Sequence, residues 1–186
     1  MGDPKKTRKM YETPQHPWKK GRLEEEAQIK RTYGLKNKRE VWRVQTMVRR
    51  LRARARNLIS ARGENAKRLE KELLGTVLKL GLVGDEATTD DILALTAESV
   101  MDRRLQTVVY KKGLARSMKQ ARQFINHGHI TLYGRRITSP GYLVQRDEVA
   151  KIGFYHTSAM ADPNHVERVV QAVSKPESEA PEEVRD

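Results

Sequence analysis

Apolar residues in the first half of the chain recur every three or four positions, which is the spacing of one face of an α-helix. The longest of these stripes predicts a helix that Asn37 caps and that runs through Ala61, with Glu40 at capping-box spacing from the cap. Its apolar positions are Val41, Val44, Val48, Leu51, Ala55 and Leu58. A second stripe with the same spacing predicts a helix that packs on the first as an αα-hairpin. The second stripe consists of Ala66, Leu69, Leu73, Val77 and Leu80.

Two shorter helices are predicted on either side of this hairpin. Residues 21–33 place acidic side chains in the first turn and basic ones in the last, an order that suits the helix dipole. In the acidic connector at 85–99, Thr89 is predicted to cap a short helix. We interpret Asp90 and Asp91 as N-terminal charges of that helix, because no second titratable group stands at a spacing useful for acid–base catalysis.

Two more helices are predicted in the second half of the chain by capping-box spacing. Ser99 with Asp102 precedes an apolar run that ends near Gly113. Ser117 with Gln120 precedes a second run, which Gly128 closes. The apolar face of that second helix consists of Ala121, Phe124 and Ile125.

Short strands are predicted after these helices. Residues 130–132 and Ile137 flank a turn at Tyr133-Gly134, and residues 143–144 and 149–152 supply two further strands. The sequence therefore predicts an α+β fold, in which a helical N-terminal domain precedes a small domain of two helices packed on a short antiparallel sheet.

Charge is distributed unevenly along the chain. The 186 residues include 37 Lys or Arg and 24 Asp or Glu, a net charge of +13, which indicates a polyanionic partner. Basic residues dominate 1–72 and 101–173, and acidic residues dominate 73–100 and 174–186. Pattern and charge together predict a basic extended arm at 1–20, a helical domain at 21–100, a small domain at 101–156, a C-terminal helix packing back at 157–173, and an acidic disordered tail at 174–186.

The two ends of the chain carry separate expectations. The arm has no hydrophobic period and is expected to be disordered by itself. Its Tyr11 and Trp18 suit stacking on RNA bases, and docking of Trp18 on the protein's own domain is the open alternative. Near the other end, Asp162 and Pro163 are predicted to start the last helix, whose valines require burial, most simply on the helical domain.

Two clusters of basic side chains are the candidate RNA-binding residues. Residues 41–62 contain no acid, and like charges at that density repel, so we favour contact with phosphates over a solvated face. The cluster on the long helix consists of Arg43, Arg49, Arg50, Arg52, Arg54 and Arg56. The second cluster surrounds the predicted small domain, where Asp102 is the only acid between positions 102 and 146. Its members, expected outside the core, are Arg103, Arg104, Lys111, Lys112, Arg116, Lys119, Arg122, Arg135 and Arg136.

Several kinds of chemistry are not expected. The chain has no cysteine, so disulfides, thiol catalysis and cysteine-ligated zinc are excluded. His127 and His129 are not positioned to converge on a metal, and no phosphate-binding glycine loop, Ser-His-Asp set or HExxH motif occurs. We therefore expect no enzyme activity, cofactor, metal or small-molecule substrate. No apolar run approaches the ~20 residues that span a bilayer, and the basic start lacks the apolar segment of a signal peptide, so a cytoplasmic location is expected.

Short stretches of the second half resemble the RNA-binding domain named after the small-subunit ribosomal protein S4. They are Arg104-Leu105-Gln106, Gly113-Leu114-Ala115-Arg116-Ser117, Gln120-Ala121-Arg122-Gln123, and His127-Gly128-His129-Ile130 followed by Gly134. In that family two helices pack on a small sheet, and the helical face binds structured RNA. The run that begins at Arg104 and the opening Met1-Gly2-Asp3-Pro4-Lys5 resemble the archaeal and eukaryotic branch. One departure is Tyr133, since the family usually has Asn before the turn glycine, and tyrosine is unfavourable at the positive φ of a type I′ turn.

The resemblance implies a structural constituent of the small ribosomal subunit, in which residues 21–100 form a helical rRNA-binding domain and residues 101–156 an S4-type RNA-binding domain. It implies early binding to 16S rRNA at a multi-helix junction, nucleation of the subunit body, a position beside ribosomal protein S5, and a contribution to translational accuracy. A ribosome-assembly factor with the same module and an RNA-modifying enzyme remain as alternatives. By physical reasoning alone, the two basic clusters indicate phosphate neutralisation, with RNA shape rather than base sequence being read.

Overall fold

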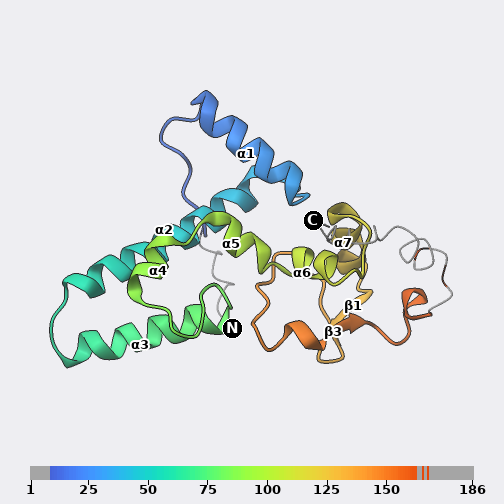
Figure 1. The fold of residues 1–186 in the computed structure, drawn as a ribbon. Helices are drawn as coiled ribbons and strands as arrows, with labels where there is room; N and C mark the ends of the chain where they lie inside the picture. The colour runs from blue at the N-terminus through green and yellow to red at the C-terminus, as the bar shows by residue number, and fades with distance from the viewer. Residues whose placement is uncertain (1–8, 163–164, 166, 168–186) are drawn as a thin grey trace, which may run out of the picture.

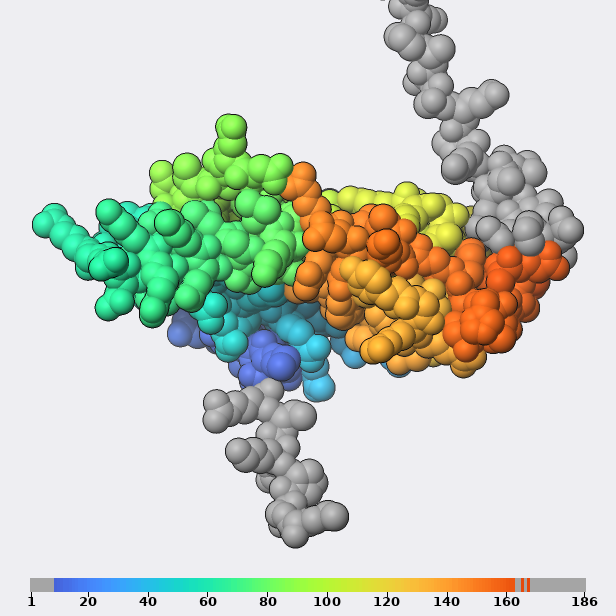
Figure 2. Space-filling view, turned by 90° about the horizontal axis from the view of Figure 1, so that it is seen from below, coloured from blue at the N-terminus to red at the C-terminus, as the bar shows by residue number. Residues whose placement is uncertain are grey.

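The computed structural model describes residues 9–162, 165 and 167, and their elements form two neighbouring domains (Figure 1). The helical domain contains α1 (Lys20–Thr32), α2 (Lys38–Ser60), α3 (Glu64–Lys79), α4 (Thr89–Ala94) and α5 (Ala97–Asp102). The C-terminal domain contains α6 (Leu105–Lys111), α7 (Met118–Asn126), β1 (Ile130–Leu132), β2 (Arg135–Arg136), β3 (Ile152–Phe154) and short 3₁₀ helices at Val149–Lys151 and Ala159–Ala161. The space-filling view shows the two domains side by side (Figure 2). The predicted α+β fold is confirmed.

Helix α2 is the spine of the helical domain. The stripe predicted from the sequence is buried from Val41 to Ala55, and α1, α3, α4 and α5 all contact this helix. Helix α3 packs on α2 as the predicted hairpin and buries Leu73 and Val77. Leu69 differs from the prediction, because it lies in an open groove between the two helices and is 47% exposed.

Two predicted helix starts are wrong by a few residues. Thr88, rather than Thr89, caps α4, and its backbone N–H donates to the Asp91 carboxylate at 2.8 Å. This capping box agrees with a structural role for Asp91 at the start of the helix. Ser99 does not start a helix but lies within α5, which Thr96 caps.

The single helix predicted from Ser99 to Gly113 is in fact two helices, α5 and α6. The chain leaves the helical conformation at Arg104, which pairs with Leu143 in an isolated antiparallel bridge. Val144 N–H donates to the Arg103 carbonyl at 2.8 Å, and Leu105 N–H donates to the Tyr142 carbonyl at 2.7 Å. These bonds to a distant segment replace the helical ones, so local spacing gave no sign of the break.

The C-terminal domain has its own hydrophobic core, formed where α6 and α7 pack on a sheet with strand order β2-β1-β3. Ser117 caps α7 as predicted, and its hydroxyl accepts from Gln120 N–H at 3.2 Å. The predicted strand at 143–144 is only the isolated bridge, and the one at 149–152 begins as a 3₁₀ helix that leads into β3.

The turn at the end of β1 has positive φ at both central residues, +51° at Tyr133 and +77° at Gly134. These signs are those of a type I′ turn, so tyrosine occupies a position that its side chain disfavours.

The described part of the arm, residues 9–19, has no helix or strand before Lys19 and lies against α2. Glu12 N–H donates to the Thr46 hydroxyl at 3.0 Å, and the rings of Tyr11 and Trp42 are 5.9 Å apart. Trp18 is 88% exposed. The alternative in which Trp18 docks on the protein's own domain is therefore wrong. Of the predicted C-terminal helix from Pro163 onward, residues 165 and 167 are described, and its other residues and the acidic tail lie outside the described part of the chain.

Candidate nucleic-acid interface

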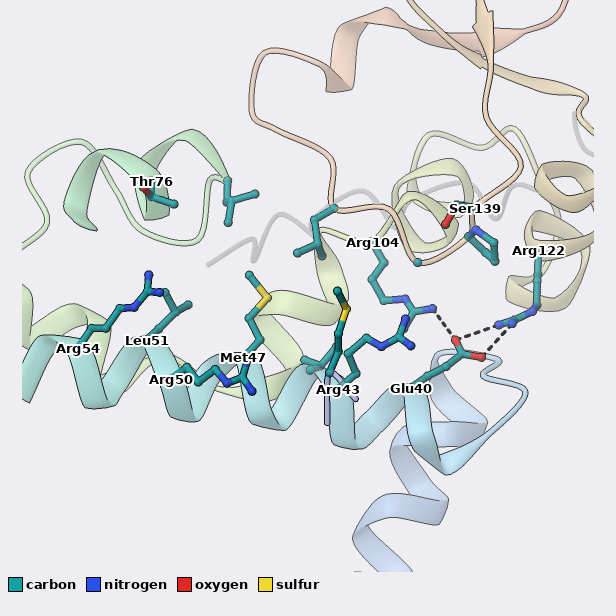
Figure 3. A pocket seen from close by; sticks show the side chains of 16 residues that line it. Glu40, Arg43, Met47, Arg50, Leu51, Arg54, Thr76, Arg104, Arg122 and Ser139 are labelled. Atoms are coloured by element: carbon teal, nitrogen blue, oxygen red, sulfur yellow. Dashed lines mark hydrogen bonds and ion pairs between the residues drawn. The ribbon is translucent and has the colours of Figure 1, made fainter. Parts of the chain in front are cut away.

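A groove of about 580 Å³ runs along α2, between the helical and C-terminal domains (Figure 3). One wall is α2, and the other is formed by the end of α3 and the 139–143 segment of the C-terminal domain. From α2 the groove is lined by Arg43, Met47, Arg50, Leu51 and Arg54. Residue spacings of three and four place these side chains on one flank of the helix, beside the buried stripe. The groove thus has an apolar floor and a row of guanidinium groups along its edge.

Three arginines of this row are available to a ligand. Within the part of the chain that the structure describes, Arg43, Arg50 and Arg54 are exposed and make no hydrogen bond or ion pair. At 1.5 Å per residue, they are spaced by about 10 and about 6 Å along the helix axis. Like charges at this density repel one another, and an anionic partner beside them would offset that repulsion.

The remaining arginines of the α2 cluster have other roles or positions. Arg49 forms an ion pair with Glu12 of the arm. Arg52 is half-buried and donates through Nη2 to the Leu95 carbonyl, so it ties α2 to α4. Arg56 is exposed near the end of the helix. The sequence pattern could not separate these arginines, because their partners come from distant segments.

The second basic cluster is not uniformly outside the core, as had been expected. Arg104 is only 5% exposed, so the prediction that it lies outside is wrong. Its Nη2 donates to Glu40 at 2.5 Å, and Arg122 donates to the same carboxylate at 2.9 and 3.1 Å. Glu40 is therefore not a capping-box residue for Asn37, whose side chain makes no cap bond.

Other members of this cluster bond to the protein itself. Arg103 donates to the Val144 carbonyl at 3.2 Å, and the Lys112 ammonium donates to the carbonyls of Val149 and Ile152 at 2.6 and 3.1 Å. Lys111 pairs with Asp102 at 2.9 Å.

Four exposed members lie just before α7, on α7 and on the β1–β2 hairpin, at Arg116, Lys119, Arg135 and Arg136. Arg136 lies over the Tyr155 ring at 3.9 Å, and Arg116 is 3.9 Å from Glu167. RNA contact by any of the predicted residues stays a prediction.

Electrostatics at the domain junction favour a charged Glu40. Partial burial alone would raise the pKa of Glu40, but the hydrogen bonds and charges of Arg122 and Arg104 together outweigh it, so the pKa lies below its ordinary value. The carboxylate is consequently ionised at neutral pH, and it keeps two guanidinium groups of the C-terminal domain beside α2.

Gln106 connects the two domains, and the sequence analysis did not single it out as a structural residue. Its buried amide donates to the carbonyls of Met118 at 2.8 Å and of Tyr33 and Gly34 at 3.2 Å each. The Tyr33 hydroxyl donates to Asp102 at 3.2 Å, and burial with that carboxylate raises the pKa of Tyr33 to about 12. A polar residue on the buried face of a helix was the available signal.

The histidine pair is accounted for by contacts within the domain. His129 Nδ1 lies 2.8 Å from the Ser158 hydroxyl, and the rings of His127 and His129 stack at 6.1 Å. Burial, followed by the charges of His127 and Arg136, lowers the pKa of His129. Among residues 9–162, 165 and 167, no group of three metal-ligating side chains converges. None of the helices described here combines the length and apolarity needed to cross a membrane.

Comparisons with known proteins match the C-terminal domain to a family model and most of the chain to named relatives. Residues 103–149 match the family model of the S4 domain. The chain is 54% identical over 158 residues to small ribosomal subunit protein uS4 of Ignicoccus hospitalis, which covers 85% of this chain and 95% of the relative. It is 51% identical over 160 residues to proteins of the same name from Methanothermobacter thermautotrophicus (86% and 94% covered) and Saccharolobus solfataricus (86% and 88% covered). The similarity therefore extends well beyond the S4 domain into the helical domain.

Proposed function

Because the chain belongs to the uS4 family of small ribosomal subunit proteins, we propose that it is a structural constituent of the small ribosomal subunit and binds 16S rRNA. The observation that carries this proposal is the row of Arg43, Arg50 and Arg54 along the groove, unpaired within the described residues and facing the same way. Arginine forks match phosphate oxygens well, and neutralised phosphates release counterions, which drives binding.

The groove supports recognition of RNA shape. Its walls come from both domains, so an RNA must present phosphates to α2 and reach the 139–143 segment at the same time. The apolar floor at Met47 and Leu51 suits sugar edges or an unstacked base better than a continuous duplex. A multi-helix junction offers such irregular backbone, and a simple hairpin offers less of it.

The exposed residues of the C-terminal domain extend this interface in the proposal. Lys119 on α7 and Arg135 on the hairpin are exposed cations that can meet further phosphates. Further proposals, which rest on the family resemblance, are early binding during assembly, nucleation of the subunit body, contact with ribosomal protein S5, and a contribution to translational accuracy. A cytoplasmic location follows from residence in the ribosome.

Sedimentation tests the proposal most simply. A tagged copy of the chain, produced in the organism from which the sequence comes, is expected to co-sediment with mature small subunits at about one copy per subunit. It should stay bound when the subunits are washed at moderate salt. A ribosome-assembly factor would instead be confined to precursor particles. Incubation of the chain with rRNA should leave the RNA covalently unchanged, whereas a modified nucleotide would support the enzyme alternative.

A further inference from the structure

The junction between the domains is built around one carboxylate. Glu40 lies in the first turn of α2, in the helical domain, and both of its partners, Arg104 and Arg122, belong to the C-terminal domain. The side chains are 18%, 6% and 20% exposed, so all three groups are largely removed from water. Figure 3 shows both arginines directed at the Glu40 carboxylate. The ion-pair cluster therefore joins elements that lie more than 60 residues apart in the sequence.

A third guanidinium group lies at the same end of the groove. Arg43, three residues after Glu40 on α2, points along the groove toward Arg104 (Figure 3). Burial lowers the pKa of Arg104 despite Glu40, and the charges of Arg122 and Arg43 act in the same direction. Two cations thus contact the Glu40 carboxylate, and a third, Arg43, lies beside Arg104 without an ion pair to Glu40 in the described structure. If Glu40 were neutral, the three arginines would form a ready site for any phosphate group.

A second set of contacts holds the same junction next to the first, since Arg122 also donates to the Gln106 side-chain oxygen at 3.4 Å. The Gln106 amide clamps the carbonyls of Tyr33 and Gly34 to the start of α7. Gly34 has φ of +57°, and a Cβ there would lie 2.9 Å from Met118 Cβ, so the two domains touch closely at this point. The junction is therefore fixed by two sets of contacts, those of Glu40 and those of Gln106, which share Arg122.

We propose that Glu40 is a specificity-determining residue for RNA. Its carboxylate prevents this arginine cluster from binding phosphates of non-cognate RNA, and it fixes the angle between the α2 groove and the C-terminal domain. The inference rests on the proposed rRNA-binding function. With Glu40 in place, an RNA binds tightly only if its phosphates contact Arg43, Arg50 and Arg54 and the C-terminal domain at the same time, in one fixed arrangement. Without it, the freed guanidinium groups bind phosphates wherever they occur.

Physical reasoning favours specificity over simple stability as the role of this carboxylate. A buried ion pair loses as much solvation as it gains in attraction, and apolar side chains of similar volume often stabilise a junction equally well. A repulsive charge that excludes wrong partners is, by contrast, a direct way to raise discrimination.

The test compares the Glu40→Gln variant with Glu24→Gln in the full chain. Both changes remove one negative charge, but Glu24 is an exposed residue of α1, 67% accessible, whose only contact in the described structure is a 4.0 Å pair with Lys20. Each protein is titrated with a multi-helix 16S rRNA junction fragment and with a simple hairpin, over a range of salt concentrations.

For Glu40→Gln we expect tighter hairpin binding, with a salt slope steeper by about one unit for each additional phosphate bound. The preference for the junction fragment should fall by about tenfold or more, because avidity between two linked sites requires that their geometry match the target. Glu24→Gln should keep the preference of the original chain. An unchanged preference in a folded Glu40→Gln protein would overturn the inference.

A readout without RNA separates this inference from the proposed function. The chain has no cysteine, so single cysteines at the exposed positions Ser60 and Gln123 accept one spin label in each domain. The distance distribution should broaden in Glu40→Gln and stay narrow in Glu24→Gln, and equally narrow distributions would contradict the angle-fixing role.

If Glu40→Gln does not fold, Arg122→Gln serves in its place. It should lower the junction preference without tightening hairpin binding, and an unchanged preference there would count against the inference. If the original chain itself shows no junction preference, the proposed function fails first, and the inference fails with it.

Discussion

At the scale of single residues, the role of each arginine is decided by its neighbours. Arg43 faces the groove without a partner in the described structure, Arg52 donates to a backbone carbonyl, and Arg104 is buried against Glu40. The same side chain therefore supplies ligand contact, helix packing and a domain junction within one small protein. Substitutions at these positions should separate binding from stability.

Reversing the charge of Arg122 should destabilise the protein. Arg122→Glu would place two carboxylates together and leave Arg104 with a weakened partner, so we expect the free energy of unfolding to fall by about 2 kcal/mol. Thermal unfolding measures the effect. Lys119→Glu, an exposed residue of the same helix, is the matched control and should leave the unfolding temperature nearly unchanged. Equal unfolding temperatures for both variants would contradict a structural role for Arg122.

The turn residue Tyr133 offers a stabilising substitution. Its φ of +51° is costly for tyrosine, and Asn before Gly is favoured in a type I′ turn, so Tyr133→Asn should raise the free energy of unfolding by about 1 kcal/mol. Tyr133→Val should lower it, because a β-branched side chain tolerates this conformation even less. Denaturant unfolding of the two variants checks the prediction, and a Val variant as stable as the Asn variant would refute it.

At the scale of elements, α2 serves two purposes on different faces. Its apolar stripe forms the core of the helical domain, and its arginine row borders the groove. The two faces are adjacent, so folding of the hairpin also aligns the cations.

Removing the arginine row should weaken RNA binding selectively. A variant in which alanine replaces Arg43, Arg50 and Arg54 should have a flatter slope of log affinity against log salt concentration. The slope should change by up to about 0.9 for each phosphate that is no longer neutralised, which is the value for duplex DNA. Filter binding over a salt series measures this slope. Arg49 and Arg56 changed to alanine should have a smaller effect, since Arg49 is held by Glu12. Equal slopes for the two variants would place the RNA elsewhere.

The sequence predicted helices where one local pattern decided the outcome. The α2 stripe, the Ser117 cap and the helix ends at Gly113 and Gly128 all depend on residues within a few positions, and all are present. The break at Arg104, the burial of Arg104 and Arg122, and the groove itself depend on contacts with segments tens of residues away. A capping-box spacing at Glu40 was misleading, because its carboxylate gains more from two guanidinium groups than from one backbone N–H.

At the scale of the whole molecule, two hydrophobic cores are joined by a polar junction. Each domain has its own core cluster, and the links between them include the contacts of Glu40 and Gln106 and the ion pair of Asp102 with Lys111. Such a junction holds the two basic surfaces in one orientation, while each core folds largely from its own residues.

The isolated C-terminal domain should fold but discriminate poorly. A fragment of residues 97–162 keeps its own core yet lacks the α2 row, so we expect it to bind a junction fragment and a hairpin with similar affinities. Circular dichroism verifies folding, and competition titration compares the two RNAs. A fragment as selective as the full chain would assign the discrimination to the C-terminal domain alone.

The most direct test of rRNA binding by the groove is a high-resolution cryo-EM map of the assembled small subunit from the same organism. We expect the guanidinium groups of Arg43, Arg50 and Arg54 to lie about 3 Å from rRNA phosphate oxygens, with Arg104 and Arg122 still bound to Glu40. A groove filled by a neighbouring protein, or left facing solvent while rRNA contacts another surface, would contradict the proposed interface.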